Sequence, residues 1–189
     1  MKITQLFVLS SLLFVFLSCD NTKKQEANLQ KTEKASTSTS KTLDAEYTGI
    51  LTEQDLMSSN YTNRWFTPRK EQYVPHKPSI KIIEKHINDY DIEVFMGTWC
   101  PDSHNEIPRL FSILDEVNYD QDKLTVYTLD RNKQSAENVE KGKDIFNVPT
   151  IIFYKNGKEI NRFVESPRES LARDMAKIVS GKEYKNIYE

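Results

Sequence analysis

Cys100 is the residue of this sequence best suited to chemistry, and it lies in the segment 97–103, GTWCPDS. An apolar run at 92–96 precedes it and predicts a buried strand, whereas the residues after Pro101 predict a helix. The thiol should therefore lie at a strand-to-helix turn, where free helix amides and the helix dipole favour the thiolate over the thiol. Because the thiolate is the nucleophile, this position predicts a reactive cysteine.

The second chemical feature is a serine in the place of a partner cysteine. In a two-cysteine site the first thiolate attacks a disulfide and the second cysteine resolves the mixed disulfide. Three residues after Cys100 stands Ser103, which can donate a hydrogen bond to a thiolate but cannot resolve a disulfide. The sequence therefore predicts attack by one nucleophile and release by an external thiol. The alternative is that Ser103 is an ordinary polar residue of the first helical turn.

Two ionisable neighbours bear on the charge of this sulfur. Asp102 is negative and disfavours the thiolate, whereas His104 favours it if the imidazole is charged and leans back by one helical turn. The simpler alternatives are that Asp102 is a first-turn helix charge and that His104 faces solvent. The alternative to a reactive Cys100 is an inert, packed cysteine.

Other chemistries lack the residues that they need. Besides Cys100 the region has three scattered histidines, which predict no metal site, and it has no glycine-rich phosphate loop. We therefore expect no cofactor. The formal net charge is −2 with both signs interspersed, so nucleic acid is not expected as a partner.

Hydrophobic periodicity predicts the elements that position Cys100. The pair Asn156-Gly157 predicts a hairpin turn, and Ser166 with Pro167 and Glu169 predicts the capped start of a final helix. The expected elements are a helix from Ser79, a strand at 92–96, a helix after Pro101 that contains Pro108, a strand at 124–129, a helix at 135–143, hairpin strands at 150–154 and 160–164, and the final helix. This order predicts an α/β fold in which helices cover both faces of a mixed sheet.

Four marks resemble the thioredoxin family over about residues 79–182: Trp99-Cys100-x-x at a helix start, Pro108 eight residues later, Val148-Pro149-Thr150 before the hairpin, and Lys155-Asn156-Gly157 in its turn. The resemblance implies a thioredoxin fold, with a central mixed sheet flanked by helices. It further implies a cis bond at Pro149, which would lie against the reactive sulfur; a simple turn proline is the alternative. The residues that would hold a substrate peptide are Trp99, Pro101, Val148, Pro149 and Thr150.

The sequence departs from this family near the strand before Cys100. Members with two cysteines commonly have a buried aspartate six residues before the reactive cysteine, where this sequence has Val94. The change agrees with the missing second thiol, because no resolving thiol has to be deprotonated. Glu93 should face the other side of the strand. Peroxide-reducing relatives need proline and threonine where Glu93 and Gly97 stand, so that activity is not expected.

The first residues predict export. Lys2 and the apolar segment 6–17 have the layout of a signal peptide, residues 1–18, and Ser18-Cys19 resembles the bacterial lipoprotein signal, with Phe16 where that signal usually has leucine. The resemblance implies that Cys19 carries a lipid and that polar residues 19–43 form a flexible tether. The domain would then lie on the non-cytoplasmic side of a bacterial envelope membrane. An ordinary secretory signal is the alternative.

The remaining residues, 44–189, predict one domain with its own core. Residues 44–78 precede the family-like part and are too aromatic to belong to the tether. We expect them to pack at the sheet edge and complete the core. The alternative is that Trp65 and Phe66 form part of a partner surface.

Together these observations predict an envelope-anchored thiol-disulfide oxidoreductase that acts through Cys100, with Ser103 assisting. Its expected partners are exported proteins or small thiols as substrates, an external thiol as reductant, and the membrane through the lipid. The prediction requires the Cys100 sulfur to be open to water and charged near neutral pH. The alternatives are a redox-silent module that binds peptides or a partner protein in the same groove, and a covalent homodimer through Cys100.

Overall fold

The computed structural model describes residues 41–189. The predicted signal peptide, the proposed lipid site at Cys19 and the tether as far as residue 40 lie outside the described residues. Within 41–189, no helix has both the length and the hydropathy to cross a bilayer.

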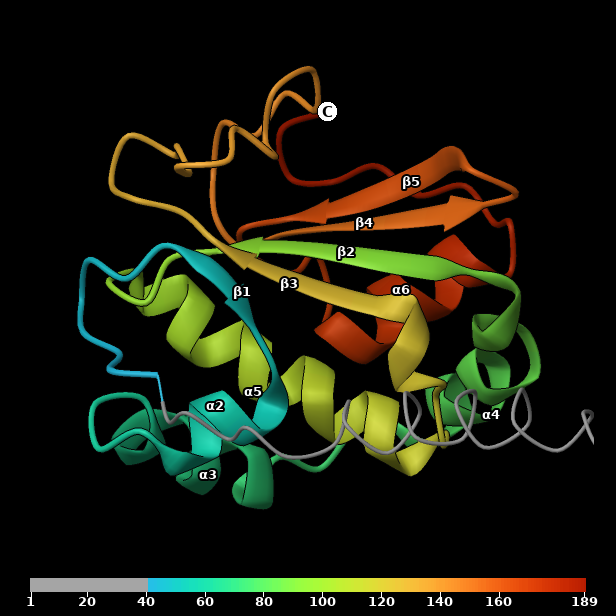
Figure 1. The fold of residues 1–189 in the computed structure, drawn as a ribbon. Helices are drawn as coiled ribbons and strands as arrows, with labels where there is room; N and C mark the ends of the chain where they lie inside the picture. The colour runs from blue at the N-terminus through green and yellow to red at the C-terminus, as the bar shows by residue number, and fades with distance from the viewer. Residues whose placement is uncertain (1–40) are drawn as a thin grey trace, which may run out of the picture. The chain divides into compact units, whose positions relative to one another are not determined.

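A mixed five-stranded sheet forms the centre of the fold, in the order β1-β3-β2-β4-β5 (Figure 1). Only β2 and β3 are parallel; the other neighbours are antiparallel. The strands are β1 (Gly49–Leu51), β2 (Asp91–Met96), β3 (Leu124–Thr128), β4 (Thr150–Lys155) and β5 (Lys158–Val164). The turn between β4 and β5 has positive φ at both Asn156 and Gly157, 54° and 73°, as the hairpin prediction requires.

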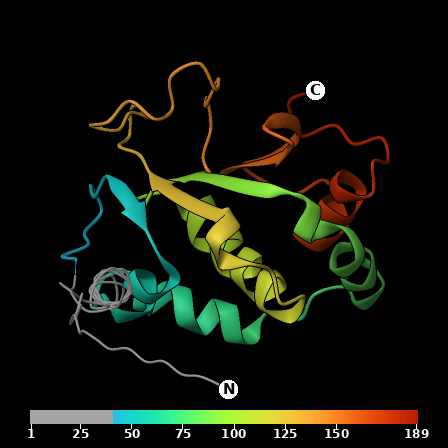
Figure 2. The same ribbon diagram turned by 45° about the vertical axis from the view of Figure 1, so that its right-hand side comes forward.

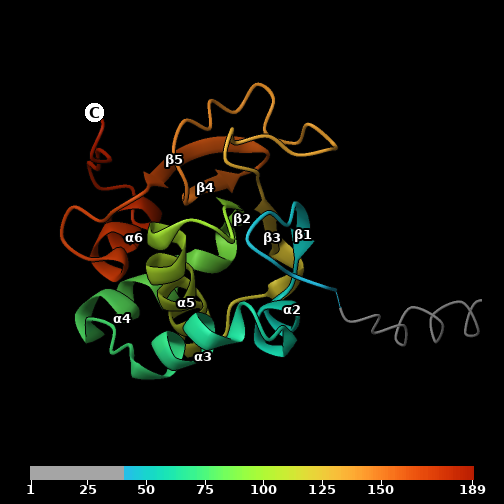
Figure 3. The same ribbon diagram turned by 90° about the vertical axis from the view of Figure 1, so that its left-hand side faces the viewer.

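The helices lie on one side of this sheet (Figures 1 and 3). They are α2 (Glu53–Ser58), α3 (Asn63–Gln72), α4 (Lys77–His86), α5 (Pro101–Glu116) and α6 (Leu171–Val179), with short 3-10 turns η1 (Ile87–Asp89) and η2 (Gln121–Lys123). The main core fills the space between helices and sheet, and α5, which runs through Pro108, contributes the fully buried Ile107, Leu110 and Leu114 to it. The predicted α/β fold with helices flanking a central mixed sheet is confirmed.

The opposite face of the sheet is covered by the connection between β3 and β4, which we name the strap (residues 129–149) (Figure 2). The predicted helix at 135–143 is wrong, because the strap consists of turns and irregular backbone. Positive φ angles at Lys133, Asn138 and Asp144 interrupt any helical run. Helices therefore do not cover both faces: on this side a second, smaller core forms beneath the strap from Phe95, Cys100, Leu129, Val148 and Ile152.

Residues 44–78 complete the core at the sheet edge, as expected. β1 pairs antiparallel with β3, and α3 packs on α5. Trp65 is 7% exposed and Phe66 is 0% exposed, with the Phe66 ring in an edge-to-face contact with Phe111. The alternative of a partner surface at Trp65 and Phe66 is therefore wrong.

Lys41, the first residue that the structure describes, is fixed to the edge of the sheet. Its ammonium group donates to the carbonyl of Ile50 at 2.8 Å and to the carboxylate of Asp55 at 2.6 Å. Leu43, the last residue of the predicted tether, is buried in the main core.

The final helix begins later than its sequence predicts. Ser170, not Ser166, is the N-cap, and its hydroxyl accepts a hydrogen bond from the amide of Arg173. The buried carboxylate of Asp174 accepts the amides of Arg168 and Glu169, at 2.7 and 3.3 Å. Together with the hydrogen bonds of the Arg168 guanidinium to the carbonyls of Lys185 and Asn186, these contacts hold the predicted first turn in a non-helical conformation.

Candidate functional site

Cys100 lies at the predicted strand-to-helix turn, as the N-cap of α5. Its amide donates to the carbonyl of Gly97 at 3.0 Å, and the amide of His104 donates to the Cys100 carbonyl at 3.0 Å. Pro101 occupies the first helical turn, where its missing amide costs no hydrogen bond. Gly97 is needed for the close approach of the indole ring, since a Cβ there would lie 2.6 Å from a ring carbon of Trp99.

The thiol of Cys100 is covered, which corrects the expectation of a sulfur open to water. The residue is free of disulfides and 5% exposed. Its sulfur lies 3.1 Å from the carbonyl oxygen of Val148, to which the thiol donates a hydrogen bond. The physical reason is the strap, because its two ends, Leu129 and Val148, pack around the sulfur.

Ser103 is directed toward the backbone before the helix. Its hydroxyl oxygen accepts the amide hydrogen of Gly97 at 3.2 Å, and the residue is fully buried. Among the described residues it makes no hydrogen bond to the Cys100 sulfur. The geometry therefore places Ser103 in a structural contact that joins α5 to the end of β2.

His104 also turns away from the sulfur. Its ring stacks on Trp65, with centroids 4.2 Å apart, and its Nε2 atom is 2.6 Å from the carbonyl oxygen of Thr98. Burial is the main cause that lowers the pKa of His104, and Arg69 adds to it, while the Thr98 contact opposes both. A neutral imidazole that donates to Thr98 fits this position, and it supplies no positive charge to a thiolate.

The predicted peptide-binding residues surround Cys100, but most of their polar groups are already engaged. The Val148–Pro149 bond is cis, and both residues are buried. The hydroxyl of Thr150 donates to the carbonyl of Asn147 at 2.7 Å. The indole of Trp99 donates to the carbonyl of Leu129 at 2.9 Å, and Pro101 is exposed.

The rim near Pro149 is acidic. The amide of Glu165 donates to the Pro149 carbonyl at 2.7 Å, and its carboxylate accepts from the hydroxyl of Tyr188. Partial burial and the negative charge of Asp102 raise the pKa of Glu165, while Lys133 opposes the shift.

Sequence reasoning missed Lys143, a lysine of the strap that is held against the sheet face beneath the strap. Lys143 bonds to the carboxylate of Glu93 and to the hydroxyl of Tyr154, at 2.5 and 3.2 Å. Val94, the next residue along β2, is fully buried in the main core, so the two side chains face opposite sides as expected. The available signal was the charge of Glu93 inside an apolar strand, since such a charge needs a partner.

A second missed residue is the buried carboxyl of Glu106 on α5, which is 4% exposed. One oxygen accepts from the guanidinium of Arg109, and the other has no hydrogen-bond partner among the described residues. Burial raises the pKa of Glu106 to about 7, with Asp102 and Asp174 adding to the shift and Arg109 opposing it. No group of three or more metal-ligating side chains lies together within 41–189.

Of the comparisons with known proteins, the family model agrees with this architecture. A family model described as Thioredoxin matches residues 50–178. A search of curated proteins found no match. Similar solved structures include a protein of unknown function from Pseudomonas aeruginosa, 15% identical over 70% of this chain and 87% of that one, with a TM-score of 0.47. Another is an HIV epitope scaffold, 16% identical over 71% of this chain and 88% of that one, also with a TM-score of 0.47.

Proposed function

This chain belongs to the thioredoxin family, and from that premise we propose that it exchanges thiols and disulfides through Cys100 alone. The observation that carries the proposal is the position of Cys100. It is the N-cap of α5 and lies in hydrogen-bond contact with Val148, directly before Pro149. No other cysteine occurs in the described part of the chain, so the site has one nucleophile.

The reaction has two exchange steps. Cys100 first loses its proton to solvent, and the thiolate attacks one sulfur of a partner disulfide. A bond forms between the two sulfurs, the partner's own disulfide bond breaks, and its leaving thiolate takes up a proton. A thiolate from an external thiol then attacks the mixed disulfide, which releases Cys100 and leaves that thiol joined to the partner. The external thiol is therefore the reductant.

The covered thiol adds a condition to this reaction. The thiol donates a hydrogen bond to the Val148 carbonyl, and the residue is 5% exposed, so a partner disulfide cannot reach the sulfur in this arrangement. Reaction then requires the strap to move away from the sulfur, either spontaneously or when a partner binds. The half-buried indole of Trp99 and the exposed ring of Pro101 are the parts of the site that a partner meets first.

The partners follow from the sequence at the N-terminus. A lipid on Cys19 would hold the domain to a membrane on the non-cytoplasmic side of a bacterial envelope. Its substrates would then be cysteines of exported proteins or small thiols. Metabolic labelling with a fatty acid, compared between the wild type and Cys19→Ala, tests the anchor independently of the redox chemistry.

Trapping of mixed disulfides tests the exchange itself. Cells that express the full chain are acid-quenched, and envelope proteins are separated on non-reducing gels. We expect reducible adducts of the wild type that are absent from Cys100→Ala. An adduct of twice the chain mass would instead indicate the covalent homodimer. If no reducible adduct forms even under added disulfide oxidant, the exchange proposal is wrong.

The second candidate is a redox-silent module that binds a peptide or a partner protein. The burial of Cys100 and its donor role to Val148 favour it, because a packed thiol also serves as a small apolar residue. This candidate requires that Cys100→Ala retain the cellular function, whereas the exchange mechanism requires its loss.

A further inference from the structure

Residues of the strap and of the sheet bury the Cys100 side chain together, in the second core on the sheet face away from the helices. The strap leaves β3 at Leu129 and returns at Val148, and both of these ends contact Cys100 in the second core. The apolar strap residues Val139 and Ile145 pack against the same cluster. Any movement of the strap therefore changes the access of reagents to the sulfur.

Lys143 fixes the strap to the sheet below it. Its ammonium lies 2.5 Å from a carboxylate oxygen of Glu93 and 3.2 Å from the hydroxyl oxygen of Tyr154. It also lies over two aromatic rings, 5.3 Å from the centroid of Tyr154 and 5.9 Å from that of Phe95. A cation in this position gains from the carboxylate and from both ring faces.

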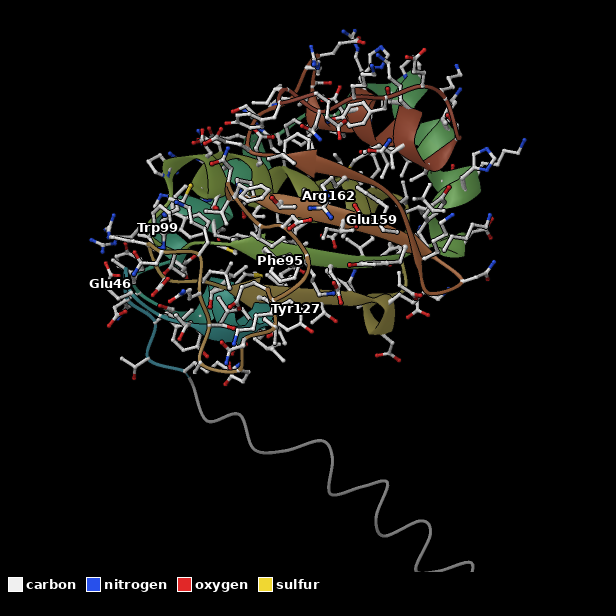
Figure 4. All side chains as sticks on the ribbon, turned by 90° about the horizontal axis from the view of Figure 1, so that it is seen from above. Glu46, Phe95, Trp99, Tyr127, Glu159 and Arg162 are labelled. Atoms are coloured by element: carbon white, nitrogen blue, oxygen red, sulfur yellow. The ribbon has the colours of Figure 1, made fainter. Side chains whose placement is uncertain are left out.

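The backbone of the strap is held at the same residue. The guanidinium of Arg162 on β5 donates to the carbonyl of Lys143 at 2.7 Å, and its two other nitrogens bond to Glu159. Figure 4 looks down on this face, where Phe95 and Tyr127 lie side by side and Arg162 lies beside Glu159. The rings of Phe95 and Tyr127 are stacked, with centroids 5.2 Å apart. The side chain and the backbone of Lys143 are thus both bonded to neighbouring residues of β2, β4 and β5.

Polar contacts in the middle of the strap are mostly internal to it. The carboxylate of Asp130 accepts amides of Asn132 and Gln134, and Ser135 bonds to Glu140. These contacts give the strap its own shape but do not tie it to the sheet. Release of the Lys143 ammonium would therefore remove the ion pair that ties the strap to β2, whereas the Arg162 contact to the Lys143 carbonyl and the ion pair of Arg131 with Glu46 would remain.

We propose that Lys143 is a latch that holds the strap closed over Cys100, and that its release admits a partner to the thiol. Val148, whose carbonyl holds the thiol proton, follows Lys143 by five residues, so release also frees this carbonyl to move. The inference deepens the proposed function by naming the residue that controls access to the nucleophile. The inference rests on the proposed function for its biological purpose, but its test measures access to the thiol and does not require exchange activity.

The test measures alkylation of Cys100 by iodoacetamide in the full, natively folded chain, followed by mass spectrometry of the peptide that contains Cys100. Lys143→Met keeps most of the aliphatic chain and removes the ammonium. The matched control is Lys141→Met, because Lys141 is exposed on the same strap and pairs with no carboxylate there. We expect at least a fivefold faster reaction in Lys143→Met and a change of less than twofold in Lys141→Met.

Two further measurements keep the result specific. Salt screens the ion pair, so raising ionic strength should speed alkylation of the wild type but not of Lys143→Met, since iodoacetamide is uncharged. Low urea should leave the rate in Lys143→Met unchanged, because local opening exposes little new surface. Equal rates in Lys143→Met and the wild type would overturn the latch, and so would a faster rate that follows the urea dependence of global unfolding. Faster alkylation without any trapped mixed disulfide would support the latch while removing the exchange function.

Discussion

At the scale of single residues, the thiol of Cys100 and the hydroxyl of Ser103 have separate hydrogen-bond partners. The thiol donates to the Val148 carbonyl, whereas the Ser103 oxygen accepts from the Gly97 amide. The pair therefore does not act as a thiolate and its donor in the resting structure. Ser103 instead satisfies a buried amide that the end of β2 leaves without a strand partner.

Removing the Ser103 hydroxyl should destabilise the fold more than it changes reactivity. Ser103→Ala leaves the buried Gly97 amide without an acceptor, which costs about 1–3 kcal/mol. Urea denaturation measures this loss, with Ser112→Ala on the same helix as a control that should change stability by less than about 0.5 kcal/mol. A Ser103→Ala variant as stable as the wild type would contradict the assigned contact.

Glu106 should make stability depend on pH. Burial raises its pKa in the folded chain to about 7 from 4.5, so the folded state retains a proton that the unfolded state has lost between these values. Stability is then highest below about pH 4.5 as far as this group is concerned, and falls as pH rises toward 7, by up to about 3 kcal/mol.

Glu106→Gln isolates that contribution. The variant lacks the titrating group, so its stability relative to the wild type should increase between pH 4.5 and 7 and level off above. Urea denaturation at several pH values gives the difference directly. Other groups, among them His104 with its lowered pKa, cancel in this comparison. A difference that does not vary with pH would show that Glu106 is already ionised in the folded chain.

At the scale of elements, the loop from β2 to α5 depends on close contact between Gly97 and Trp99. Gly97→Ala places a Cβ 2.6 Å from the indole ring, so the ring must move and its hydrogen bond to Leu129 must lengthen. We expect a loss of about 1–3 kcal/mol in stability and faster alkylation of Cys100, since Leu129 begins the strap. Gly181→Ala meets no neighbouring atom but is strained at a φ of +71°, so it measures a backbone strain without an indole contact and should leave the alkylation rate unchanged. An unchanged alkylation rate in Gly97→Ala would show that the position of the Trp99 indole does not control access to the Cys100 thiol.

The sequence predicted those elements whose signals are local. β2 is an apolar run, α5 follows a proline and carries an apolar stripe, and the turn at Asn156 and Gly157 needs residues that tolerate positive φ. The start of α6 was mispredicted because Ser166 and Ser170 both suit an N-cap, and the choice depends on the hydrogen bonds of Arg168 to the C-terminal segment. Such a choice is made by tertiary contacts, which local patterns do not contain.

The burial of Cys100 could not be predicted from the sequence for the same reason. Its position at the helix start follows from nearby residues, but its exposure is decided by Leu129 and Val148, which are 29 and 48 positions later in the chain. The strap has no helical or strand period from which its path could be read. The position of Cys100 at the start of a helix was therefore predicted correctly, whereas its burial was not.

At the scale of the whole molecule, residues 44–78 are part of the cooperative fold. Phe66→Ala should cost about 3–5 kcal/mol, because the lost ring is fully buried against Phe111 and leaves a cavity between α3 and α5. Thermal unfolding measures the change, and the exposed Met57→Ala on the neighbouring α2 should cost much less. A single transition at a lower temperature is expected. Two separate transitions would mean that this region folds on its own.

The attachment of Lys41, the first described residue, to the sheet edge determines how the molecule responds to a pulling force. Lys41 is clamped to Ile50 and Asp55, beside β1, and β3 separates β1 from β2 and the loop that carries Cys100. Under the proposed lipid anchor, tension would strain the Lys41 contacts and the outermost strand first, and it would reach the strap through the ion pair of Glu46 with Arg131.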